Sequence, residues 1–336
     1  MILILNCGSQ SIKYKIYTKS LKLIKEKQVD FFGEKKFKRI LRKELLSIDE
    51  EINLIGHRIV HGGEKFRKPV VITRTVLRKL KGIKLAPLHN PFNLLGIKIT
   101  SRRFPRTKMI AVFDTGFYED LPEKASLYPV PGDFKKFGFH GISHEYVSNQ
   151  YPNKKIISCH LGGGTSITAI KNGKPLDTSM GYTPLEGAMM MTRSGDIDPV
   201  IVLQLGKKAE KILNYESGVK AICGEVDMRD VLKRVEKKDK TAQLALDIYC
   251  YKIQKYIGAY YAILGGCDIL IFTGAIGFGS EKIRKMITKD LKILKASKTK
   301  IVAIEPNEAL AIAQKITEKV RPRGGAKRRK RSFLEE

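Results

Sequence analysis

The stretch "LILNCGSQSIKYKIY", residues 3–17, decides the fold. An apolar run breaks at a small polar bend and then resumes in strand-like alternation, which predicts two strands joined by a short turn. The stretch "IISCHLGGGTSITAI", residues 156–170, has the same pattern, and an offset of 155 positions places Gly8 on Gly163. Bends of this kind expose backbone N–H groups that suit phosphate oxygens. The repeat therefore predicts two related halves.

Length and composition set the class of protein. A chain of 336 residues that is 43% hydrophobic can bury a large core and favours two domains. No apolar run has membrane-spanning length, and the first polar break comes at Asn6, so we expect neither a membrane span nor a signal peptide. The five cysteines are scattered and contain no C-x-x-C pair. This usage favours reduced thiols in a cytoplasm over disulfides or a zinc site.

The net charge is +29, and part of it lies in "RPRGGAKRRKRSFLEE", residues 321–336. A basic run interrupted by glycine is typical of a disordered tail. A nucleic-acid-associated protein is one interpretation of such a balance. We recognise no RNA- or DNA-binding module, however, and lysines on helix faces are usually solvated surface. We favour that interpretation for the body of the chain, and nucleic-acid contact by the tail remains open.

The hydrophobic pattern alternates between helices and strands along the chain. A hairpin turn is expected at "KNGKP", residues 171–175, and a hinge near 147–154. The expected helices span 34–46, 75–82, 91–103, 141–151, 239–264, 279–289 and 307–319, and the expected strands span 52–60, 108–113, 268–274 and 300–304. This order predicts an α/β protein with a repeated sheet-plus-helix unit and a ligand cleft between the halves.

Several polar side chains follow predicted strands. Arg58 taken alone is best explained as a surface arginine, whereas Asp114 is equally well a turn cap or a catalytic or metal-binding group. His140 and His144 have the i, i+4 spacing of zinc ligands, but the intervening glutamate of a metalloprotease helix is absent and no third ligand is evident, so zinc is disfavoured.

The second half carries further signals. Asp198 before a proline fits a helix N-cap, and the methionines at 189–191 fit core positions. "FTGAIGFGS", residues 272–280, is a third glycine-rich turn at a strand-to-helix junction, where an anion or nucleotide can meet a helix N-terminus. Each signal is weak alone. The three glycine bends, Arg58, Arg193 and Asp114 together indicate phosphoryl transfer.

Nine strings, in order along the chain, resemble the acetate kinase family. They are "NCGSQSIKY", "GHRIVHGGEKF", "APLHNPFN", "VFDTGF", "GFHGISH", "CHLGGGTSITAI", "TSMGYTPLEG", "TRSGDIDP" and "PNEALAIA". The resemblance places the chain in the actin, hexokinase and Hsp70 group. It implies two duplicated RNase H-like (actin-like ATPase) domains with an active-site cleft between them: residues 1–150, residues 151–306 that bind the nucleotide, a helix at 307–320 that packs back on the first domain, and the tail at 321–336.

The reaction implied by the resemblance is reversible phosphoryl transfer from ATP to acetate, giving acetyl phosphate and ADP. A homodimer that uses Mg²⁺, with Mn²⁺ as a substitute, is implied with it. Asp114, His140 and Arg193 match the catalytic positions, and Asn6 and Glu308 match the metal site. The acceptor positions are Arg58, Val60, Leu88, Phe139 and Pro184. The nucleotide positions are Ser9, Ser11, Lys13, His160, Leu161, Gly162, Gly163, Gly164, Asp227, Met228, Arg229, Ala275, Ile276, Gly277, Phe278 and Gly279.

The chain departs from the family pattern on the nucleotide side. Gly163 stands where the family usually has asparagine, and residues 275–279 read Ala-Ile-Gly-Phe-Gly where it usually has Gly-Ile-Gly-Glu-Asn. The chain is also several dozen residues shorter than usual. These departures concern the phosphoryl donor more than the acceptor. A related acyl kinase for propionate or butyrate, and a pyrophosphate-dependent acetate kinase, are the alternatives.

Overall fold

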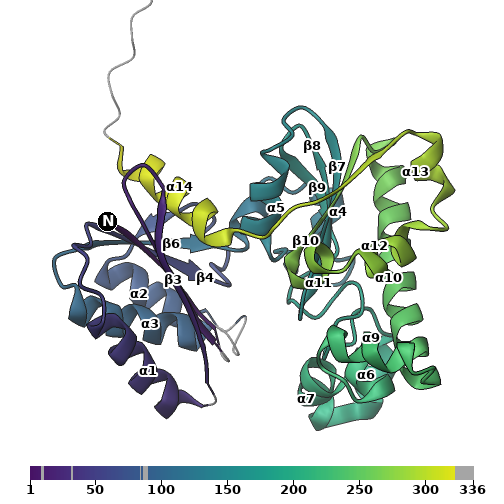
Figure 1. Ribbon diagram of the computed structural model, residues 1–336, viewed down its shortest axis with the longest axis horizontal. Helices are drawn as coiled ribbons and strands as arrows, with labels where there is room; N and C mark the ends of the chain where they lie inside the picture. The colour runs from purple at the N-terminus through teal and green to yellow at the C-terminus, as the bar shows by residue number, and fades with distance from the viewer. Residues whose placement is uncertain (9–10, 32, 84, 86–89, 322–336) are drawn as a thin grey trace, which may run out of the picture.

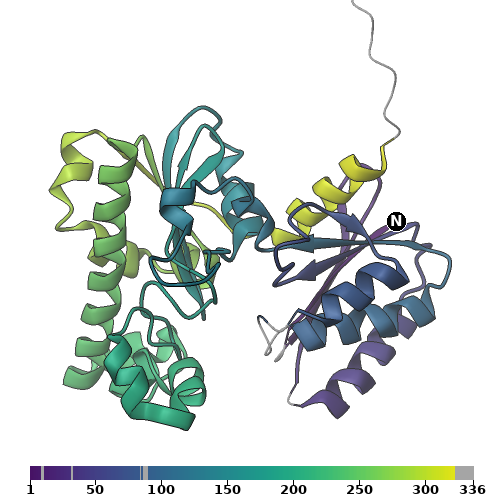
Figure 2. The ribbon, with the colours of Figure 1, turned by 180° about the vertical axis from the view of Figure 1, so that it is seen from behind.

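A computed structural model describes residues 1–8, 11–31, 33–83, 85 and 90–321. The protein has two lobes side by side, and each lobe is built on one β-sheet flanked by helices (Figure 1). Figure 2 shows from behind that helix α14, near the end of the chain, lies on the lobe that contains the N-terminus.

The first sheet has six strands in the order β3-β2-β1-β4-β6-β5. Strands β1, β2 and β3 form an antiparallel meander, and β4 and β6 extend the sheet in parallel with β1. The strands are β1 (Ile2–Cys7), β2 (Ser11–Tyr17), β3 (Leu23–Asp30), β4 (Leu54–Ile59), β5 (Val70–Val71) and β6 (Lys108–Phe113).

The second sheet has five strands in the order β11-β10-β7-β8-β9. Here β7, β8 and β9 form the antiparallel meander, and β10 and β11 continue in parallel with β7. The strands are β7 (Lys155–Leu161), β8 (Thr165–Lys171), β9 (Lys174–Thr178), β10 (Ile269–Thr273) and β11 (Lys300–Ala303). Apart from β5, this topology repeats that of the first sheet, which confirms the predicted duplication.

Strand register corrects the offset between the repeats. The last paired residues before the two bends are Cys7 and Leu161, so Gly8 corresponds to Gly162 and not to Gly163. The strands resume at Ile12 and at Thr165, which makes the second bend one residue shorter. A single offset read from sequence cannot match both strands of hairpins whose loops differ in length.

The first sheet is covered on both faces. Alternate residues of β1 pack on opposite sides: Leu3 and Leu5 join the core beneath α1 (Glu34–Leu46) and α3 (Asn90–Arg103), whereas Ile2 and Ile4 join the core beneath α14 (Glu308–Val320). α2 (Arg74–Lys81) packs beside α3. This alternation is the period of two expected for a strand buried on both faces.

Close packing of α14 depends on a glycine. A Cβ at Gly56 in β4 would lie 2.8 Å from the side chains of both Ile312 and Ile4. The absence of a side chain at Gly56 therefore lets α14 lie directly on the sheet, and Ile312 and Ile316 are fully or almost fully buried there.

Helix α5 (Gly141–Ser148) lies between the two sheets. Its Ile142 belongs to the core under α14, and its Val147 belongs to a core with Ile156 and Ile271 of the second sheet. The other face of the second sheet packs on α10 (Lys240–Leu264), in a core that includes Met189 and Met191, as predicted.

The remaining short elements complete the two lobes. Asp198 caps α6 by accepting a hydrogen bond from the backbone N–H of Val200, as predicted. Among the described residues, every helix falls short of the length or apolarity needed to cross a bilayer. The remaining short helices of the two lobes are η1 (Gly116–Tyr118), α4 (Glu123–Ser126), α6 (Pro199–Leu205), η2 (Gly206–Lys208), α7 (Ala209–Lys211), η3 (Ile212–Glu216), α8 (Val219–Cys223), α9 (Met228–Glu236), α11 (Gly274–Gly279), α12 (Glu281–Thr288) and α13 (Lys292–Ala296).

Most predicted elements are present with bounds within a few residues of those expected, and the predicted hairpin turn joins β8 to β9 through Asn172 and Gly173. The prediction of a glycine-rich turn at residues 272–280 was wrong about the secondary structure. Residues Gly274–Gly279 are not an open turn but the short helix α11, which begins directly after β10. The left-handed backbone of Gly274 makes the sharp change of direction that glycine permits.

Candidate active site

Residues from both lobes line one cavity of about 240 Å³. The first lobe contributes the ends of β1, β4 and β6, and the second lobe contributes its glycine bend and the segment that contains Arg193. The lining residues are Asn6, Gly8, Ser11, Lys13, Arg58, Val60, Asn93, Asp114, Phe139, His140, Gly164, Pro184 and Arg193.

Arg58 and Asp114 form a two-point ion pair in this cavity. Arg58 donates from Nε to Oδ1 at 2.9 Å and from Nη2 to Oδ2 at 2.6 Å. The two residues end the neighbouring parallel strands β4 and β6, where Arg58 pairs with Val112 and Ile59 with Phe113. Burial opposes the charge of Arg58, but Asp114 raises its pKa above the usual value. Arg58 is therefore not an isolated surface side chain but a fixed cation.

Arg193 brings a second guanidinium to the cavity from the second lobe. Its Nη1 donates to the backbone carbonyl of Pro184 at 3.3 Å. A Cβ built at Gly164 would lie 3.5 Å from the same nitrogen. Burial lowers the pKa of Arg193, but a guanidinium remains charged at any physiological pH. Two arginines, one from each lobe, thus face one small volume, as suits a site for anions.

His140 lies at the start of α5 in a left-handed conformation, with φ of 55°. Such a backbone is uncommon for a residue with a side chain and tends to mark functional sites. Its Nδ1 lies 2.8 Å from Ser166 Oγ, and its ring stacks on His160 with centroids 4.2 Å apart. Burial, together with nearby His160 and Arg58, lowers the pKa of His140 well below its usual value. The ring is neutral and can donate a hydrogen bond without adding charge.

Val60, Phe139 and Pro184 form the apolar part of the cavity wall. Phe139 is almost fully buried, and Val60 packs in the same small cluster. Leu88, the fourth apolar acceptor residue expected from the resemblance, lies outside the described residues, as does Ser9 of the first bend. The remaining apolar wall combines the branched Val60 with the rings of Phe139 and Pro184 around a small cavity, which suits a short acyl group.

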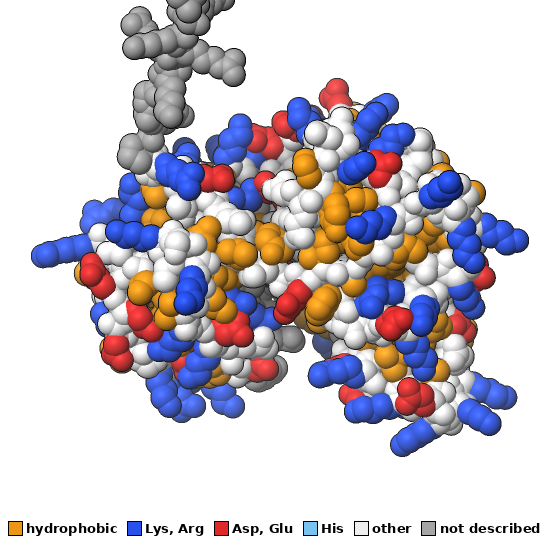
Figure 3. Space-filling model, turned by 45° about the horizontal axis from the view of Figure 1, so that its top comes forward, with side chains coloured by type: hydrophobic (Ala, Val, Ile, Leu, Met, Phe, Trp, Pro, Cys, Tyr) orange, Lys and Arg blue, Asp and Glu red, His pale blue; other side chains and the backbone are white. Residues whose placement is uncertain are grey.

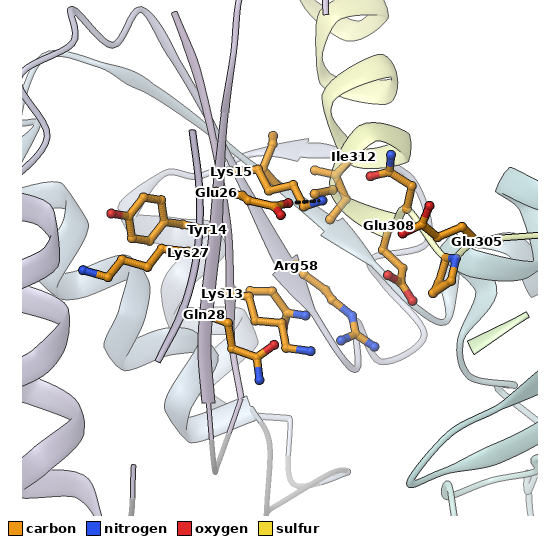
Figure 4. A pocket seen from close by; sticks show the side chains of 15 residues that line it. Lys13, Tyr14, Lys15, Glu26, Lys27, Gln28, Arg58, Glu305, Glu308 and Ile312 are labelled. Atoms are coloured by element: carbon orange, nitrogen blue, oxygen red, sulfur yellow. Dashed lines mark ion pairs between the residues drawn. The ribbon is translucent and has the colours of Figure 1, made fainter. Parts of the chain in front are cut away.

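A second pocket of about 420 Å³ shares Asn6, Lys13 and Arg58 with the cavity. Figure 4 shows that the side chains of Glu308, Arg58 and Lys13 all line this second pocket, with the Glu308 carboxylate near the Arg58 guanidinium. Burial raises the pKa of Glu308, but the charges of His160, Arg58 and Lys13 outweigh it and lower the pKa overall. Glu308 therefore presents a carboxylate to the junction of the two pockets.

The second glycine bend is folded back on itself and packs against α11. Gly162 N–H donates to the carbonyl of Gly164 at 2.9 Å. A Cβ at Gly162 would lie 4.0 Å from the Ala275 nitrogen, and one at Gly277 would lie 3.4 Å from the Leu161 side chain. The structure thus brings two of the nucleotide segments expected from the resemblance, 160–164 and 275–279, next to each other.

The side chains in these two segments differ in solvent exposure. Leu161 is fully buried in the core of the second lobe and Ile276 packs against that core, whereas Phe278 is 42% exposed. The side chain of Leu161 therefore packs in the core, and its backbone is the part that can face a ligand.

Asp227, Met228 and Arg229 begin α9. Asp227 caps the helix by accepting from the Arg229 backbone N–H, and the two side chains also form an ion pair. Met228 is buried in the second-lobe core, whereas Arg229 is exposed. The structure does not bring this group into the cavity that contains Arg58 and Arg193.

Sequence reasoning missed Asn93, which lines the cavity. Its Oδ1 accepts from the Val60 backbone N–H at 3.1 Å, and its Nδ2 donates to the Cys7 carbonyl at 2.6 Å. Asn93 therefore ties the end of β1 to the segment after β4. The available signal was an amide side chain in a helix whose buried face also includes Asn90 and Thr100, because buried polar side chains need partners.

The model of the acetokinase family matches residues 25–308. The chain belongs to the acetokinase family. An acetate kinase from Carboxydothermus hydrogenoformans is 39% identical over 393 aligned residues, which cover 95% of this chain and 99% of that protein.

Solved structures of acetokinase relatives have the same fold. A propionate kinase from Francisella tularensis superposes with a TM-score of 0.85 at 35% identity, over 94% of this chain and 98% of its own. An acetate kinase from Porphyromonas gingivalis gives a TM-score of 0.83 at 33% identity, over 95% and 99%. Together with the repeated sheet topology, these likenesses identify the fold of this acetokinase as two duplicated actin-like ATPase domains.

Proposed function

We propose that the protein is an acetate kinase, which transfers a phosphoryl group reversibly from ATP to acetate to give acetyl phosphate and ADP. The observation that carries the proposal is the convergence of Arg58, Asp114, His140 and Arg193 on one 240 Å³ cavity in a member of the acetokinase family. Phosphoryl transfer needs positioning and positive charge around the moving group more than covalent assistance.

Arg58 and Arg193 would bind different parts of the substrates, because only Arg58 is held by an ion pair among the described residues of the cavity. Arg58 is fixed by Asp114, so its remaining N–H groups are oriented to hold the acetate carboxylate. Arg193 has no comparable ion pair in the described part of the chain, so its fork is available to the phosphoryl oxygens. His140 donates a hydrogen bond to the same oxygens as charge develops on them. Val60, Phe139 and Pro184 hold the acetate methyl.

Asn6 and Glu308 fit a magnesium site. Mg²⁺ prefers oxygen ligands and is commonly held by one or two carboxylates, water and the substrate phosphates, and Asn6 and Glu308 line one pocket beside Lys13. When bound, the ion would neutralise charge on the nucleotide phosphates; Mn²⁺ has the same ligand preference. Lys13, Ser11 and the 160–164 bend would hold the phosphates, and α11 and the start of α9 would hold the nucleoside.

We further propose the division into domains 1–150 and 151–306, with α14 completing the first domain. α14 packs on β1, β4 and α5, which supports this boundary. A homodimer is proposed on the strength of the family and of α6, whose Val200, Ile201 and Leu203 are between 44% and 77% exposed. The scattered cysteines, all buried and unpaired, support a cytoplasmic location.

A hydroxamate assay of acetyl phosphate tests the reaction directly. The purified chain should produce acetyl hydroxamate from acetate, Mg²⁺ and ATP, and GTP and pyrophosphate should be run as alternative donors. Absence of product with every donor, in folded protein, contradicts the proposal. Product with pyrophosphate alone would make the enzyme a pyrophosphate-dependent acetate kinase.

Propionate is the second candidate acceptor, because a solved relative is a propionate kinase. One additional methylene changes discrimination by only about 1–3 kcal/mol. We therefore expect propionate to react more slowly than acetate and butyrate more slowly again. A kcat/KM for propionate or butyrate above that for acetate would reverse the assignment.

A further inference from the structure

Four side chains form a continuous hydrogen-bonded chain that leads from the interior to the cavity. Ser158 Oγ lies 2.8 Å from His144 Nδ1, and His144 Nε2 lies 2.8 Å from Ser166 Oγ. Ser166 Oγ in turn lies 2.8 Å from His140 Nδ1. His144, Ser158 and Ser166 are each fully buried.

The single hydroxyl proton of Ser166 links the tautomers of His140 and His144. A serine hydroxyl has one proton, and a neutral imidazole has one N–H and one acceptor nitrogen. Burial lowers the pKa of both His140 and His144 well below the usual value, so both rings are neutral. If Ser166 donates to His140 Nδ1, then His144 Nε2–H donates to Ser166, and Ser158 donates to His144 Nδ1. Reversal of the His140–Ser166 bond alone makes Ser166 Oγ accept from both rings and leaves its buried proton without an acceptor among the described residues, which is costly. Reversal of either other bond alone leaves two donors or two acceptors facing each other.

The direction of this chain decides what His140 presents to a ligand. A Cβ built at Gly164 would lie 3.3 Å from His140 Nε2 and 3.5 Å from Arg193 Nη1, so Nε2 is on the cavity side of the ring. In one direction Nε2 carries the proton and can donate to an anion. In the other direction Nε2 presents a lone pair, which repels phosphoryl oxygens.

We propose that Ser166 and His144 are positioning residues that fix the tautomer of His140, so that its Nε2–H faces the transferred phosphoryl group. The proposal rests on the proposed phosphoryl transfer for the role of His140, whereas the tautomer itself is a property of the folded chain. Ser158 ends the chain, and the other tautomer of His140 either leaves the buried Ser166 proton without an acceptor in the described part of the protein or requires all three bonds to reverse.

Ring ¹⁵N NMR of the full chain labelled at histidine tests the tautomer without reference to catalysis. The two ring nitrogens of a neutral imidazole have well-separated shifts according to which one carries the proton, and loss of signals in His140→Gln and His144→Gln assigns the rings. We expect protonated Nε2 in both rings, in the free protein and with acetyl phosphate. Protonated Nδ1 on His140 in the acetyl phosphate complex overturns the proposal.

Activity of Ser166→Ala tests the consequence. Without the hydroxyl donor, His140 should populate both tautomers, and kcat should fall about 10- to 100-fold, because a histidine in the wrong tautomer loses its catalytic proton. The KM values for acetate and ATP should stay within about twofold, because the bond matters in the transition state. A kcat within twofold of that of the unmodified enzyme, with an unchanged His140 spectrum, contradicts the proposal.

Matched variants separate positioning from packing. Ser148→Ala removes another buried hydroxyl, from the same helix as His144, whose hydrogen bond goes to the Glu145 carbonyl; it should leave kcat and the His140 spectrum unchanged. His144→Gln keeps an N–H donor toward Ser166 and should retain more activity than His144→Leu. Equal losses in the two His144 variants would overturn the role of the chain of bonds.

Failure of the proposed function can be distinguished from failure of the tautomer proposal. If the unmodified protein makes no acetyl phosphate and acetyl phosphate causes no spectral change, the reaction assignment fails. The free-protein spectra of the unmodified chain and of Ser166→Ala then decide the tautomer on their own.

Discussion

Arg58 and Asp114 are joined by two parallel hydrogen bonds, of 2.9 and 2.6 Å, between the ends of adjacent parallel strands. Asp114 is 2% exposed at its side chain and Arg58 is 19% exposed. Two opposite charges in so little water stabilise each other only while both are present. This pair therefore couples the stability of the first lobe to the orientation of Arg58.

The destabilising effects of removing the two members should not add. Asp114→Ala should reduce the free energy of unfolding by about 3–5 kcal/mol, because it leaves an uncompensated buried cation. The double variant with Arg58→Ala should be less destabilised than the sum of the single variants, by at least about 1 kcal/mol. Urea denaturation of the four proteins checks this cycle, and additive losses would show that the pair is not energetically coupled.

Arg193→Ala should lower kcat about 10²- to 10⁴-fold with a much smaller change in KM, because its interaction strengthens as charge develops on the phosphoryl group. Steady-state kinetics with ATP and acetate measure both constants. Arg234→Ala is a matched control, since this arginine pairs with Glu225 and Asp239 in the same lobe. A near-normal kcat in Arg193→Ala would remove Arg193 from the mechanism.

Stability should decline in mild acid because of buried neutral histidines. Burial lowers the pKa of His57 to about 3, and its Nε2 has no partner within the described residues. An unfolded histidine titrates near 6.5, so below about pH 6.5 the unfolded chain takes up a proton that the folded chain refuses. The stability is complete above that pH and falls by about 1.4 kcal/mol per unit, for this group alone, towards pH 3.

Urea denaturation at pH 7.5, 6 and 5 measures this slope. His57→Leu removes the titrating group and should flatten the dependence by up to one proton. An identical pH slope in the variant and the unmodified protein would exclude His57 as a source of acid sensitivity.

The nucleotide side should accept other purine triphosphates. Gly163 offers no side-chain amide, and Phe278 replaces a polar group with an exposed ring, so one hydrogen bond worth about 0.5–1.5 kcal/mol should be missing. We expect GTP to support kcat/KM within about tenfold of ATP, equivalent to about 1.4 kcal/mol. Strict selectivity for ATP would contradict this expectation.

The structure also shows that the missing amides can be restored. A Cβ at Gly163 or at Gly279 would meet no atom within 4 Å, and neither residue has a left-handed backbone. Gly163→Asn with Gly279→Asn should therefore fold and lower the KM for ATP about threefold or more, in line with one recovered hydrogen bond. Gly258→Ala, at an equally open helix position, controls for the loss of glycine.

Deletion of residues 321–336 should leave acyl kinase activity intact. The described contacts of α14 with the first sheet end at Val320, and the tail follows that helix, so we expect it to add no active-site group. The deletion should instead weaken any binding to nucleic acid. If the full chain binds nucleic acid, its affinity should fall steeply as the salt concentration rises. Loss of catalysis in a folded truncated protein would show that the tail contributes to the site.

The sequence predicted the periodic features well. Duplication, most helices and the strand ends that carry Arg58 and Asp114 follow from hydrophobic patterns whose periods differ for helix and strand. The edge strand β3 was missed because its residues are mostly exposed and charged, so it has no apolar alternation. α11 was mistaken for a turn because three of its six residues are glycine, which disfavours helices unless packing compensates.

The site was only partly predictable, because sequence does not give partners. Asn93, Ser166 and the Arg58–Asp114 pair depend on contacts between residues 26 to 86 positions apart. His144 illustrates the limit: its spacing from His140 raised a shared zinc ion only as a disfavoured alternative and gave no other role, whereas the structure joins the two rings through Ser166. Figure 3 shows Lys and Arg spread over both lobes on the visible face, in keeping with the interpretation of most of the charge as solvated surface.

The return of α14 to the first sheet has a consequence for biosynthesis. Ile2, Ile4 and Val112 pack beneath Ile312 and Ile316, so the face of the first sheet that they form stays uncovered until the ribosome has made α14. The strands of the second lobe are therefore synthesised before the first lobe can be completed, in contrast to domains that are completed in N-to-C order. A polypeptide that stopped before Glu308 would lack α14 and leave Ile2, Ile4 and Val112 uncovered, and exposed apolar surface of this kind favours aggregation.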